Sequence, residues 1–577
     1  MGFMSPGLPD LDYEQWRQGD RMTRVRPMLE HWAERGFSPP EAVYILYVVK
    51  IVAYVAVGLL IASTTPGIGG LGHLSAWWYE PIVFEKIVIF TLLFEVLGLG
   101  CGFGPLTLRF LPPIGGPLFW LRPGTIRMPP WPRIVPGTKG SRRGIVDVIL
   151  YLGVLGVAVW TLLAPSVRSA AALGSSTGLI DSKRIIILAV VLCVLGLRDK
   201  TIFLAARSEV YLLMALTFLL SPLDLVFAAK LVMVLIWWGA ATSKLNRHFP
   251  FVVATMESNN PVMRIKAIKR MLYKDFPNDL RPSGLAGWMG HLGTVFEFVV
   301  PLVLLLSHGG MVTTVAAIAM VLFHLQIIAA QPMGVPLEWN VFMMYGVGVL
   351  FVHDARYSMG SAPHGVAILI GFLVLYGVVI IGNLFPSKFS FLIAMRYYAG
   401  NWATSLWSFS ESGRAKLAGT ITGYPGLPAD QLEKLYGAET ADLLTHKGYS
   451  FRALHSHGRA LFGLLPRAAG PNHEDYFVVD GEFVAGSTIG WNFGEGHLHN
   501  EQLIAALQER CHFEPGEVRV AILESQPFHR ETQEYRLVDA ATGEFERGTI
   551  TVSDMVERQP WSDEIPVTVL SSSPAEA

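Results

Sequence analysis

The sequence is poor in charged residues. Only 16% of its 577 residues are Asp, Glu, Lys or Arg, whereas 51% are hydrophobic, and the mean hydropathy is +0.41. About a quarter of the residues in soluble domains are charged, so this composition indicates a membrane protein. The charges also balance to a formal net charge of -1. Because nucleic-acid recognition needs a concentrated basic face, we expect no nucleic-acid partner.

Cysteine is scarce too. The residues Cys101, Cys193 and Cys511 are too few and too widely spaced for a disulfide framework or a cysteine-rich zinc site. The first forty or so residues are polar and contain arginines, and they lack the apolar core and the small-residue cleavage site of a secretory signal. We therefore expect the first apolar segment to remain in the mature protein.

Long apolar segments, in contrast, fill the first two thirds of the chain. A membrane-spanning helix needs roughly 18 or more apolar residues, and about ten segments approach this length, although 185–204 is interrupted by charges and 210–220 and 341–352 are short. The predicted fold class is therefore an all-α membrane bundle of about ten transmembrane helices with a C-terminal soluble α+β domain. The segments are 45–62, 81–99, 145–163, 185–204, 210–220, 225–245, 285–306, 311–329, 341–352 and 365–384.

The distribution of Lys and Arg predicts the orientation. The N-terminal segment and the loops 100–144 and 246–284 are rich in Lys and Arg, whereas several of the alternate loops contain none. Basic loops face the cytoplasm, so we expect a multi-pass protein of the plasma membrane with both termini in the cytoplasm. The loop 164–184, which contains three basic residues, fits this alternation least well.

The chain divides into four predicted regions. Residues 1–44 form an N-terminal cytoplasmic or interfacial segment, and residues 45–386 form the polytopic bundle. Residues 387–412 form an aromatic segment at the membrane interface, where amphipathic rings prefer to lie. Residues 413–577 form a cytoplasmic α+β domain of typical size. Within this domain the patterns predict helices at 428–446, 450–465 and 501–511, the last one capped by Asn500. They also predict a strand at 518–524 and hairpins at 476–484 and 535–552.

One span is broken in its middle. Residues 323–346, FHLQIIAAQPMGVPLEWNVFMMYG, are apolar on both flanks but contain two prolines, a glycine and a carboxylate between them. A broken helix is stable in hydrocarbon only where protein or a wet cavity covers it. Two interpretations stay open. The break is either a tight connection with Glu338 in the first turn of a new helix, where the helix dipole favours a carboxylate, or a half-broken helix that points His324, Glu338 and Asn340 into a cavity.

Ionisable side chains inside the apolar spans are the candidate catalytic residues, because each is costly there unless it faces a partner or water. Lys230 and Lys244 lie within about 40° of each other on one helix face and about 21 Å apart along it. Structural alternatives exist. Lys244 can extend to the headgroups, and Lys230 can do the same or pair with Asp224 or a neighbouring helix. Glu297 can form an interhelical hydrogen bond. The candidates are Lys230, Lys244, His291, Glu297, His324 and Glu338.

A candidate metal site lies in the predicted soluble domain. Glu495, His497 and His499 precede a helix, and His-x-His places both imidazoles on one side of an extended chain, a geometry that zinc and non-haem iron sites use with further ligands. The alternative is a polar loop that leads into the helix cap. The cofactor is unknown from the sequence, in which no phosphate-binding or dinucleotide-binding glycine motif occurs in a fitting context.

Two family resemblances are visible. GWNFGEGHLHNEQL (490–503), ESQPFHR (524–530), YRLVDAATGEFERG (535–548) and RQPW (558–561) resemble an actinobacterial multi-pass transmembrane family of unknown function, and this likeness covers the whole chain. WWGAATSKL (237–245), the span around Glu297 and the segments FHLQ and EWN are similar in arrangement to the horizontally transferred transmembrane domain of vitamin-K-dependent carboxylases. The Phe-Pro-Trp turn of that domain appears here only as Pro336-Leu-Glu-Trp339.

Three functions are consistent with these features. The first is a membrane-embedded enzyme acting on a lipid, isoprenoid or quinone, because several ionisable residues lie in apolar spans. The second is a transporter of lipids or small molecules, because discontinuous helices build transport sites near the middle of the membrane. The third is a membrane scaffold that recruits a soluble protein partner through the C-terminal domain. In each case membrane lipids are expected partners.

Overall fold

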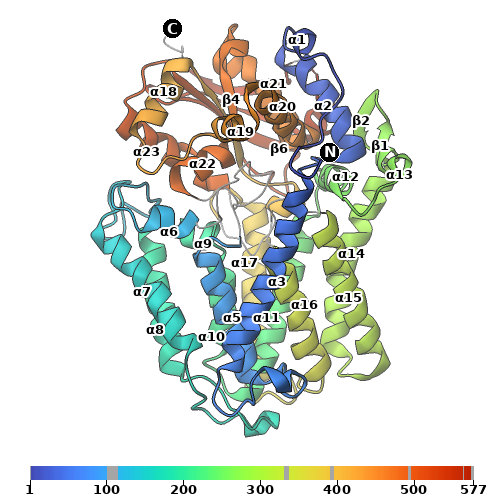
Figure 1. The fold of residues 1–577 in the computed structure, drawn as a ribbon, viewed down its shortest axis with the longest axis vertical. Helices are drawn as coiled ribbons and strands as arrows, with labels where there is room; N and C mark the ends of the chain where they lie inside the picture. Colours follow the sequence, from blue (N-terminus) through green and yellow to red (C-terminus); the bar gives the residue numbers. More distant parts are fainter. Residues whose placement is uncertain are drawn as a thin grey trace.

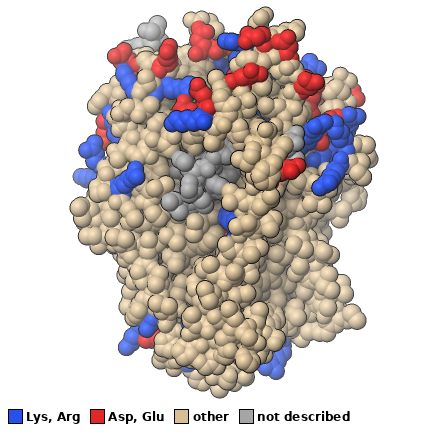
Figure 2. Space-filling view, in the orientation of Figure 1, with Lys and Arg blue, Asp and Glu red and all other residues tan. Residues whose placement is uncertain are grey.

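A bundle of long helices lies below a layer of sheet and shorter helices in the computed structural model that Figure 1 shows. The structure describes residues 2–100, 115–330, 337–389, 396–490, 496–562 and 564–573. On the face shown in Figure 2, charged side chains gather at the upper end of the molecule and, more sparsely, at its lower end, and the zone between them is nearly free of charge. Hydrocarbon requires such a zone, so the membrane surrounds the bundle here.

Six helices in the described part of the chain are long and apolar enough to cross a membrane. They are α3 (Glu41–Ser63), α7 (Ile145–Leu162), α11 (Pro222–Ser243), α14 (Gly284–Leu306), α15 (Gly310–Ala330) and α17 (Gly365–Leu384). At about 1.5 Å per residue they match a hydrocarbon core about 30 Å thick. The most apolar window of α11 is 89% buried, whereas those of the other five helices are 22–33% buried. Helix α11 is therefore the centre of the bundle, and the other five present apolar side chains to lipid.

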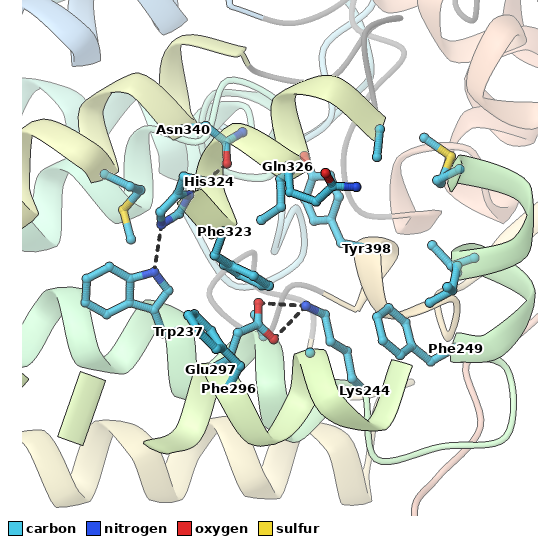
Figure 3. Close-up of a pocket in the computed structure, with 18 of the residues that line it drawn as sticks. Trp237, Lys244, Phe249, Phe296, Glu297, Phe323, His324, Gln326, Asn340 and Tyr398 are labelled. Carbon is cyan, nitrogen blue, oxygen red and sulfur yellow. Dashed lines mark hydrogen bonds and ion pairs between the residues drawn. The ribbon is translucent and has the colours of Figure 1, made fainter. Parts of the chain in front are cut away.

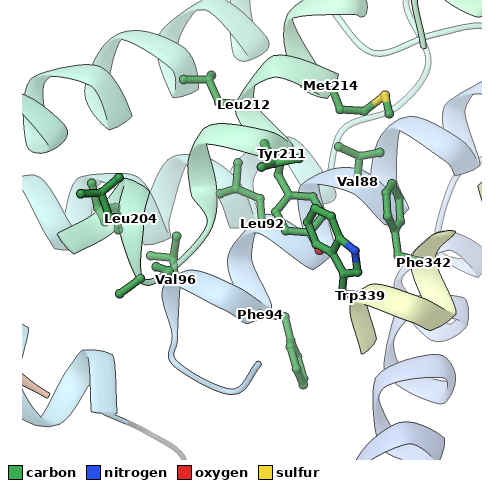
Figure 4. Close-up of a cluster of buried hydrophobic side chains, with 14 of the residues drawn as sticks. Val88, Leu92, Phe94, Val96, Leu204, Tyr211, Leu212, Met214, Trp339 and Phe342 are labelled. Atoms are coloured by element: carbon green, nitrogen blue, oxygen red, sulfur yellow. The ribbon is translucent and has the colours of Figure 1, made fainter. Parts of the chain in front are cut away.

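Four shorter helices occupy the remaining predicted spans. They are α5 (Pro81–Val96), α8 (Ser182–Arg198), α10 (Ser208–Thr217) and α16 (Leu337–Gly346), which a π-helix, η3 (Val347–His353), continues. Each has fewer than 18 residues, so the prediction of about ten spans is not confirmed. Helix α8 ends at the predicted interruption, where Asp199 pairs with Arg143 at 2.6 Å. Figure 4 shows how α5, α10 and α16 pack, with Leu92, Tyr211 and Trp339 at their contact.

Shorter elements connect and flank the bundle. Helix α2 (Arg21–Arg35) packs against α12 (Phe249–Asn259) and against a helix of the C-terminal region. This contact ties the N-terminal segment to the upper layer in Figure 1. The other elements of this part are α1 (Tyr13–Trp16), η1 (Leu71–His73), α4 (Leu74–Trp77), α6 (Gly115–Trp120), η2 (Ala171–Leu173), α9 (Thr201–Leu204), α13 (Lys266–Arg270), β1 (Tyr273–Asp275), β2 (Asp279–Pro282) and η5 (Tyr397–Ala399).

The C-terminal region is built on one antiparallel sheet. Its strands are β3 (Thr404–Phe409), β4 (Phe477–Asp480), β5 (Val518–Leu523), β6 (Thr532–Asp539), β7 (Gly543–Thr551) and β8 (Thr568–Ser572), in the spatial order β4-β3-β5-β6-β7-β8. Strand β3 comes from the aromatic segment 387–412, which we expected at the membrane interface. All six of its residues are buried, because Trp407 and Phe409 pack into the core of this region. For these residues the expected interfacial placement is wrong.

Helices cover the sheet, and their caps explain where the predictions succeed and fail. The predicted hairpin at 476–484 is wrong: the Asp480 side chain accepts a hydrogen bond from the Glu482 amide at 2.9 Å and so starts helix α22 instead of a turn. Asn500 caps α23 as predicted, and the hairpin β6–β7 and strand β5 also form as predicted. The helices are α18 (Glu411–Thr420), α19 (Pro428–Tyr436), α20 (Ala438–Leu454), α21 (Ser456–Ala469), η6 (His473–Asp475), α22 (Gly481–Ile489), η7 (Gly496–Leu498), α23 (Glu501–Cys511) and α24 (Val552–Val556).

The membrane bundle and the C-terminal region are joined by a buried histidine. His248 precedes α12, is 0% exposed, and makes hydrogen bonds with Ser456 at 2.8 Å and Gln526 at 3.0 Å. Its ring meets the His457 ring edge-on at 4.6 Å. Burial lowers the pKa of His248 to about 4, so both imidazole nitrogens serve a neutral hydrogen-bonded contact between the two parts.

Candidate functional site

A cavity of about 510 Å³ lies among α11, α12, α14, α15 and α16, with Tyr398 at one side. Figure 3 shows its interior, with aromatic rings and a small number of polar side chains on the wall. Ligand pockets of this size are typically apolar with a few placed polar groups. Most of the lining is aliphatic or aromatic, including Ile236, Phe249, Val252, Met289, Phe296, Phe323, Ile327 and Met343.

The first polar group of the wall is an ion pair. Lys244, which ends α11, points its ammonium at both carboxylate oxygens of Glu297 on α14, at 2.7 and 2.6 Å (Figure 3). The two side chains are only 9% and 4% exposed. The Lys244 ammonium also lies 5.1 Å from the centre of the Phe249 ring. Lysine and carboxylate thus neutralise each other in an apolar wall, which is the condition under which charges persist there.

The second polar group is His324 on α15. The Trp237 indole nitrogen lies 3.1 Å from Nε2 of His324, and the Asn340 amide oxygen lies 2.9 Å from Nδ1. An indole N–H only donates, so Nε2 accepts and the ring proton is on Nδ1, from which it is donated to Asn340. The imidazole is therefore neutral and held in one tautomer by partners on α11 and α16 (Figure 3).

The third polar group joins α12 to α15. The Gln326 amide donates to the two Glu257 oxygens at 3.1 and 3.0 Å. Burial raises the pKa of Glu257. Each of the three polar groups connects different helices of the wall, so together they fix the shape of the cavity. Between these polar contacts the wall is apolar.

The cavity reaches the lipid-facing surface between α14 and α15. Leu292 lines the cavity and is also 57% exposed on the outside of α14. A Cβ added to Gly293, one residue further, meets no atom within 4 Å. On α15, Gln326 lines the cavity and is exposed as well. An apolar molecule in the surrounding leaflet therefore has a lateral way in.

The structure brings three of the predicted catalytic residues together and separates the other three. Lys244, Glu297 and His324 line the same cavity, as does Asn340. Glu338 lies in the first turn of α16 as predicted, but it is not among the lining residues. Its carboxylate faces Lys50 at 3.2 Å and Arg207 at 3.8 Å.

Lys230 and His291 lie elsewhere. The Lys230 ammonium donates to three backbone carbonyls after η3, those of Asp354, Ala355 and Tyr357, at 2.9, 3.4 and 2.6 Å. An ammonium has three donors, so Lys230 holds this turn, and neither pairing with Asp224 nor extension to the headgroups is observed. His291 is exposed on the outer face of α14 and does not line the cavity.

The predicted metal ligands do not converge in the described residues. Glu495 lies outside the described residues. His497 is part of η7 and not of an extended chain, so it does not share a side with His499. His497 donates to Glu524 at 3.1 Å, and the His499 ring contacts Ser405 at 2.7 Å. Burial would raise the pKa of Glu524, but His497, the Ser525 amide and Arg536 together outweigh this effect, and the pKa falls to about 2. In the part of the chain that the structure describes, no group of three His, Cys, Asp or Glu could hold a metal ion.

Several polar residues near the cavity were not among the sequence candidates. Glu257 was not predicted because α12 has only 11 residues and is too short to be predicted as a membrane span. Glu95 lies within the predicted span 81–99 and fulfils the criterion that selected Glu297. Arg207 lines the cavity and also contacts the Glu95 carboxylate at 2.8 and 2.7 Å. A systematic list of carboxylates in apolar spans would have included Glu95.

Comparison with known proteins gives one match. A family model described as "Transmembrane protein of unknown function (DUF3556)" matches residues 1–570. No curated protein and no solved structure matches the chain. The actinobacterial origin and the likeness to the carboxylase domain therefore stay predictions.

Proposed function

The chain belongs to this family of transmembrane proteins of unknown function, and we propose that it is a membrane-embedded enzyme that acts on a lipid, isoprenoid or quinone in the cavity. The observation that carries the proposal is the cavity itself, an apolar space of about 510 Å³ with the Lys244–Glu297 pair and His324 on its wall. An apolar chain fits the interior. The polar end of the same molecule would face the polar side chains of the wall.

The position of the cavity favours an enzyme over a transporter. Its lining residues on α11 begin at Ile236, so the first half of this helix does not contribute. That first half is buried against neighbouring helices, and Lys230 closes the far turn by hydrogen bonds to backbone carbonyls. A transport site needs access from both sides of the membrane. A pocket confined to one half of the bundle is what a substrate drawn from one leaflet requires.

The wall supplies groups suited to proton transfer. Lysine and glutamate side chains serve as general acids and bases when they reach the reacting group, and Lys244 and Glu297 both line the cavity. His324 is fully hydrogen-bonded as a neutral ring, so we assign it a positioning role. In this proposal the substrate's polar end approaches the Lys244–Glu297 pair while His324 keeps α11, α15 and α16 in register.

The charge distribution supports a location for this chemistry. Loops rich in Lys and Arg face the cytoplasm in membrane proteins, and the N-terminal segment and the loops 100–144 and 246–284 carry most of the Lys and Arg residues that precede the C-terminal region. We therefore propose the plasma membrane, with both termini and the C-terminal sheet in the cytoplasm. The cavity would then open into the cytoplasmic leaflet.

Lipid retention by the purified full-length protein tests the binding step. We expect solvent extraction and mass spectrometry to find one lipid-like molecule per protein, and Gly293→Phe to reduce this amount at least fivefold by filling the open space beside Gly293. Gly371→Phe is the matched control, because a Cβ on Gly371 also meets nothing within 4 Å but this residue of α17 is not part of the cavity wall. Equal retention by the two variants would contradict the proposal.

Cellular lipid profiles test the catalytic step separately. We expect Glu297→Gln to accumulate the same lipid species as a deletion strain, while Glu297→Gln protein still retains the ligand. If deletion and variant both leave the lipid profile unchanged although the purified wild-type protein retains a lipid, then the protein binds that molecule without converting it.

A further inference from the structure

A basic and apolar surface lies beside the start of α14. Residues 261–275, here called the α13 segment, contain α13 and β1, and only the turn after β1 and strand β2 separate them from α14. We propose that the α13 segment binds the headgroups of anionic phospholipids in the adjacent leaflet. This inference goes beyond the proposed enzyme function and does not depend on it.

Four large apolar side chains of the α13 segment point outward. Val262, Ile265, Ile268 and Met271 are 75%, 60%, 40% and 60% exposed. The segment is nevertheless firmly held, because Lys269 is buried and donates to the Ser258 carbonyl at 2.6 Å. Contiguous apolar side chains exposed on an anchored element mark protein or membrane contact surfaces.

The same segment exposes cations. Arg264, Lys266, Arg270 and Lys274 are all exposed. Glu34 pairs with Lys266 at 2.9 Å and also with Arg270. Asp275 lies in the segment itself, and Asp279, opposite it in the hairpin, pairs with Arg281 at 2.5 Å. Arg264 and Lys274 have no ion pair within the described residues. Figure 2 shows Lys and Arg gathered on this flank of the molecule, around α13. The surplus of positive charge makes an anionic partner the complementary one.

Two hydrogen bonds between the α13 segment and the N-cap of α14 place this surface at the level of the headgroups. Ser283, the N-cap of α14, donates its hydroxyl to the Met271 carbonyl at 2.6 Å and its amide to the Leu272 carbonyl at 2.8 Å. Met271 is therefore level with the first residue of a membrane-spanning helix. One turn further along α14, Trp288 is 69% exposed, as expected for an aromatic ring at the interface.

The combination of features identifies the partner as lipid. Segments that carry basic side chains and outward apolar side chains at the membrane surface insert the latter between headgroups and attract anionic lipids with the former. A soluble acidic protein would satisfy the charges but would not reach apolar side chains that are level with the start of α14. The lipid leaflet that contacts the outer side of α14 would cover both the cations and the apolar side chains of the α13 segment.

Lipid titration of the full-length protein in detergent tests the inference. We expect native mass spectrometry to show that phosphatidylglycerol binds at least threefold more tightly than phosphatidylcholine, and that Arg264→Gln/Lys274→Gln removes this preference. Arg17→Gln/Lys434→Gln is the matched control, because both residues are exposed and lie away from α14. Arg17 is at the end of α1, and Lys434 is in α19. An unchanged preference in the Arg264→Gln/Lys274→Gln variant would overturn the proposal.

Hydrogen exchange locates the contact. In nanodiscs that contain phosphatidylglycerol we expect peptides from 261–275 to exchange more slowly than in pure phosphatidylcholine nanodiscs, and peptides from α18 to be unaffected. Exchange that is identical in the two kinds of nanodisc, or slowed equally in α18, would also overturn it. Because Gly293→Phe fills the cavity without touching the α13 segment, an intact headgroup preference in that variant separates this inference from the proposed enzyme function.

Discussion

Separating Lys244 from Glu297 is expected to destabilise the bundle strongly. The ammonium lies 2.7 and 2.6 Å from the two carboxylate oxygens, and both side chains are less than 10% exposed. Removal of one partner of a buried pair typically costs about 3–5 kcal/mol, because the other charge remains without compensation. Since the Lys244 side chain at the end of α11 retains 9% exposure, we expect a value at the lower end of this range, about 3 kcal/mol, for Glu297→Met.

A double-mutant cycle measures the pair itself. Lys244→Met, Glu297→Met and the double variant keep similar side-chain volumes while they remove one or both charges. We expect each single variant to cost about 3 kcal/mol and the double variant no more than about 1 kcal/mol, because apolar replacement of a whole buried pair is often nearly neutral. Unfolding by a denaturing detergent, followed by tryptophan fluorescence, provides the comparison, with Gly371→Ala on the lipid-facing α17 as a neutral control.

Additive costs would refute this reasoning. If the double variant loses as much stability as the two single variants together, the two side chains do not interact in the folded protein. The wall of the cavity would then lack its preformed ion pair, and Lys244 and Glu297 would lose their assigned role in the proposed enzyme.

Three further outcomes are expected. Asn340→Leu leaves the His324 Nδ1–H without an acceptor and should cost about 1–3 kcal/mol in the same unfolding assay, whereas Asn340→Asp, which retains an acceptor, should cost less. Lys230→Met removes three hydrogen bonds to carbonyls after η3 and should speed hydrogen exchange in 354–357 without changing lipid retention; unchanged exchange would contradict its structural role. Burial lowers the pKa of His248 to about 4 and that of His455 to about 3, below about 6.5 in the unfolded chain. The unfolded state therefore binds more protons, and the stability present above about pH 6.5 is lost as the pH falls toward about 4, by about 1.4 kcal/mol per pH unit for each histidine. Thermal unfolding of His248→Gln across this range should depend less steeply on pH than that of the wild-type protein. An equal slope would refute this assignment.

The helices of the bundle could be predicted because hydropathy over some twenty residues is a local property. Each of the ten predicted segments contains a helix, including α16 after the broken stretch. Their lengths were less predictable: α5 and α8 have 16 and 17 residues, because α5 ends just before Gly98, whose φ is 76°, and α8 ends at the Arg198–Asp199 interruption. Whether such helices cross the bilayer depends on their neighbours and not on their own composition.

The C-terminal region shows which local signals mislead. Asp480-Gly481 has the composition of a hairpin turn, yet Asp480 caps α22, because aspartate followed by a helix-compatible segment satisfies the same backbone groups. Trp407 has the character of an interfacial residue, but β3 lies between β4 and β5, so its side chain is covered by the core. Strand pairing between residues more than seventy positions apart leaves no trace in a single window of sequence.

The candidate site was predictable residue by residue but not as a group. Lys244, Glu297 and His324 stand out as ionisable side chains in apolar spans. That they share a cavity, while Lys230 and Glu338 do not, follows from how α11, α14, α15 and α16 pack. Glu338 is the clearest case, because it lies only two residues from Asn340 yet faces Lys50 and Arg207.

Helix α12 has a double attachment with a mechanical consequence. Phe249, Val252 and Met256 of this helix form part of the cavity wall, and His248 at its beginning is fastened to Ser456 and Gln526. A molecule that displaces this wall would also move the beginning of α12, which is hydrogen-bonded to Ser456 and Gln526 through His248. Binding in the cavity and the position of the C-terminal sheet are thus connected through α12, so the proposed ligand is expected to change the surface that this sheet presents.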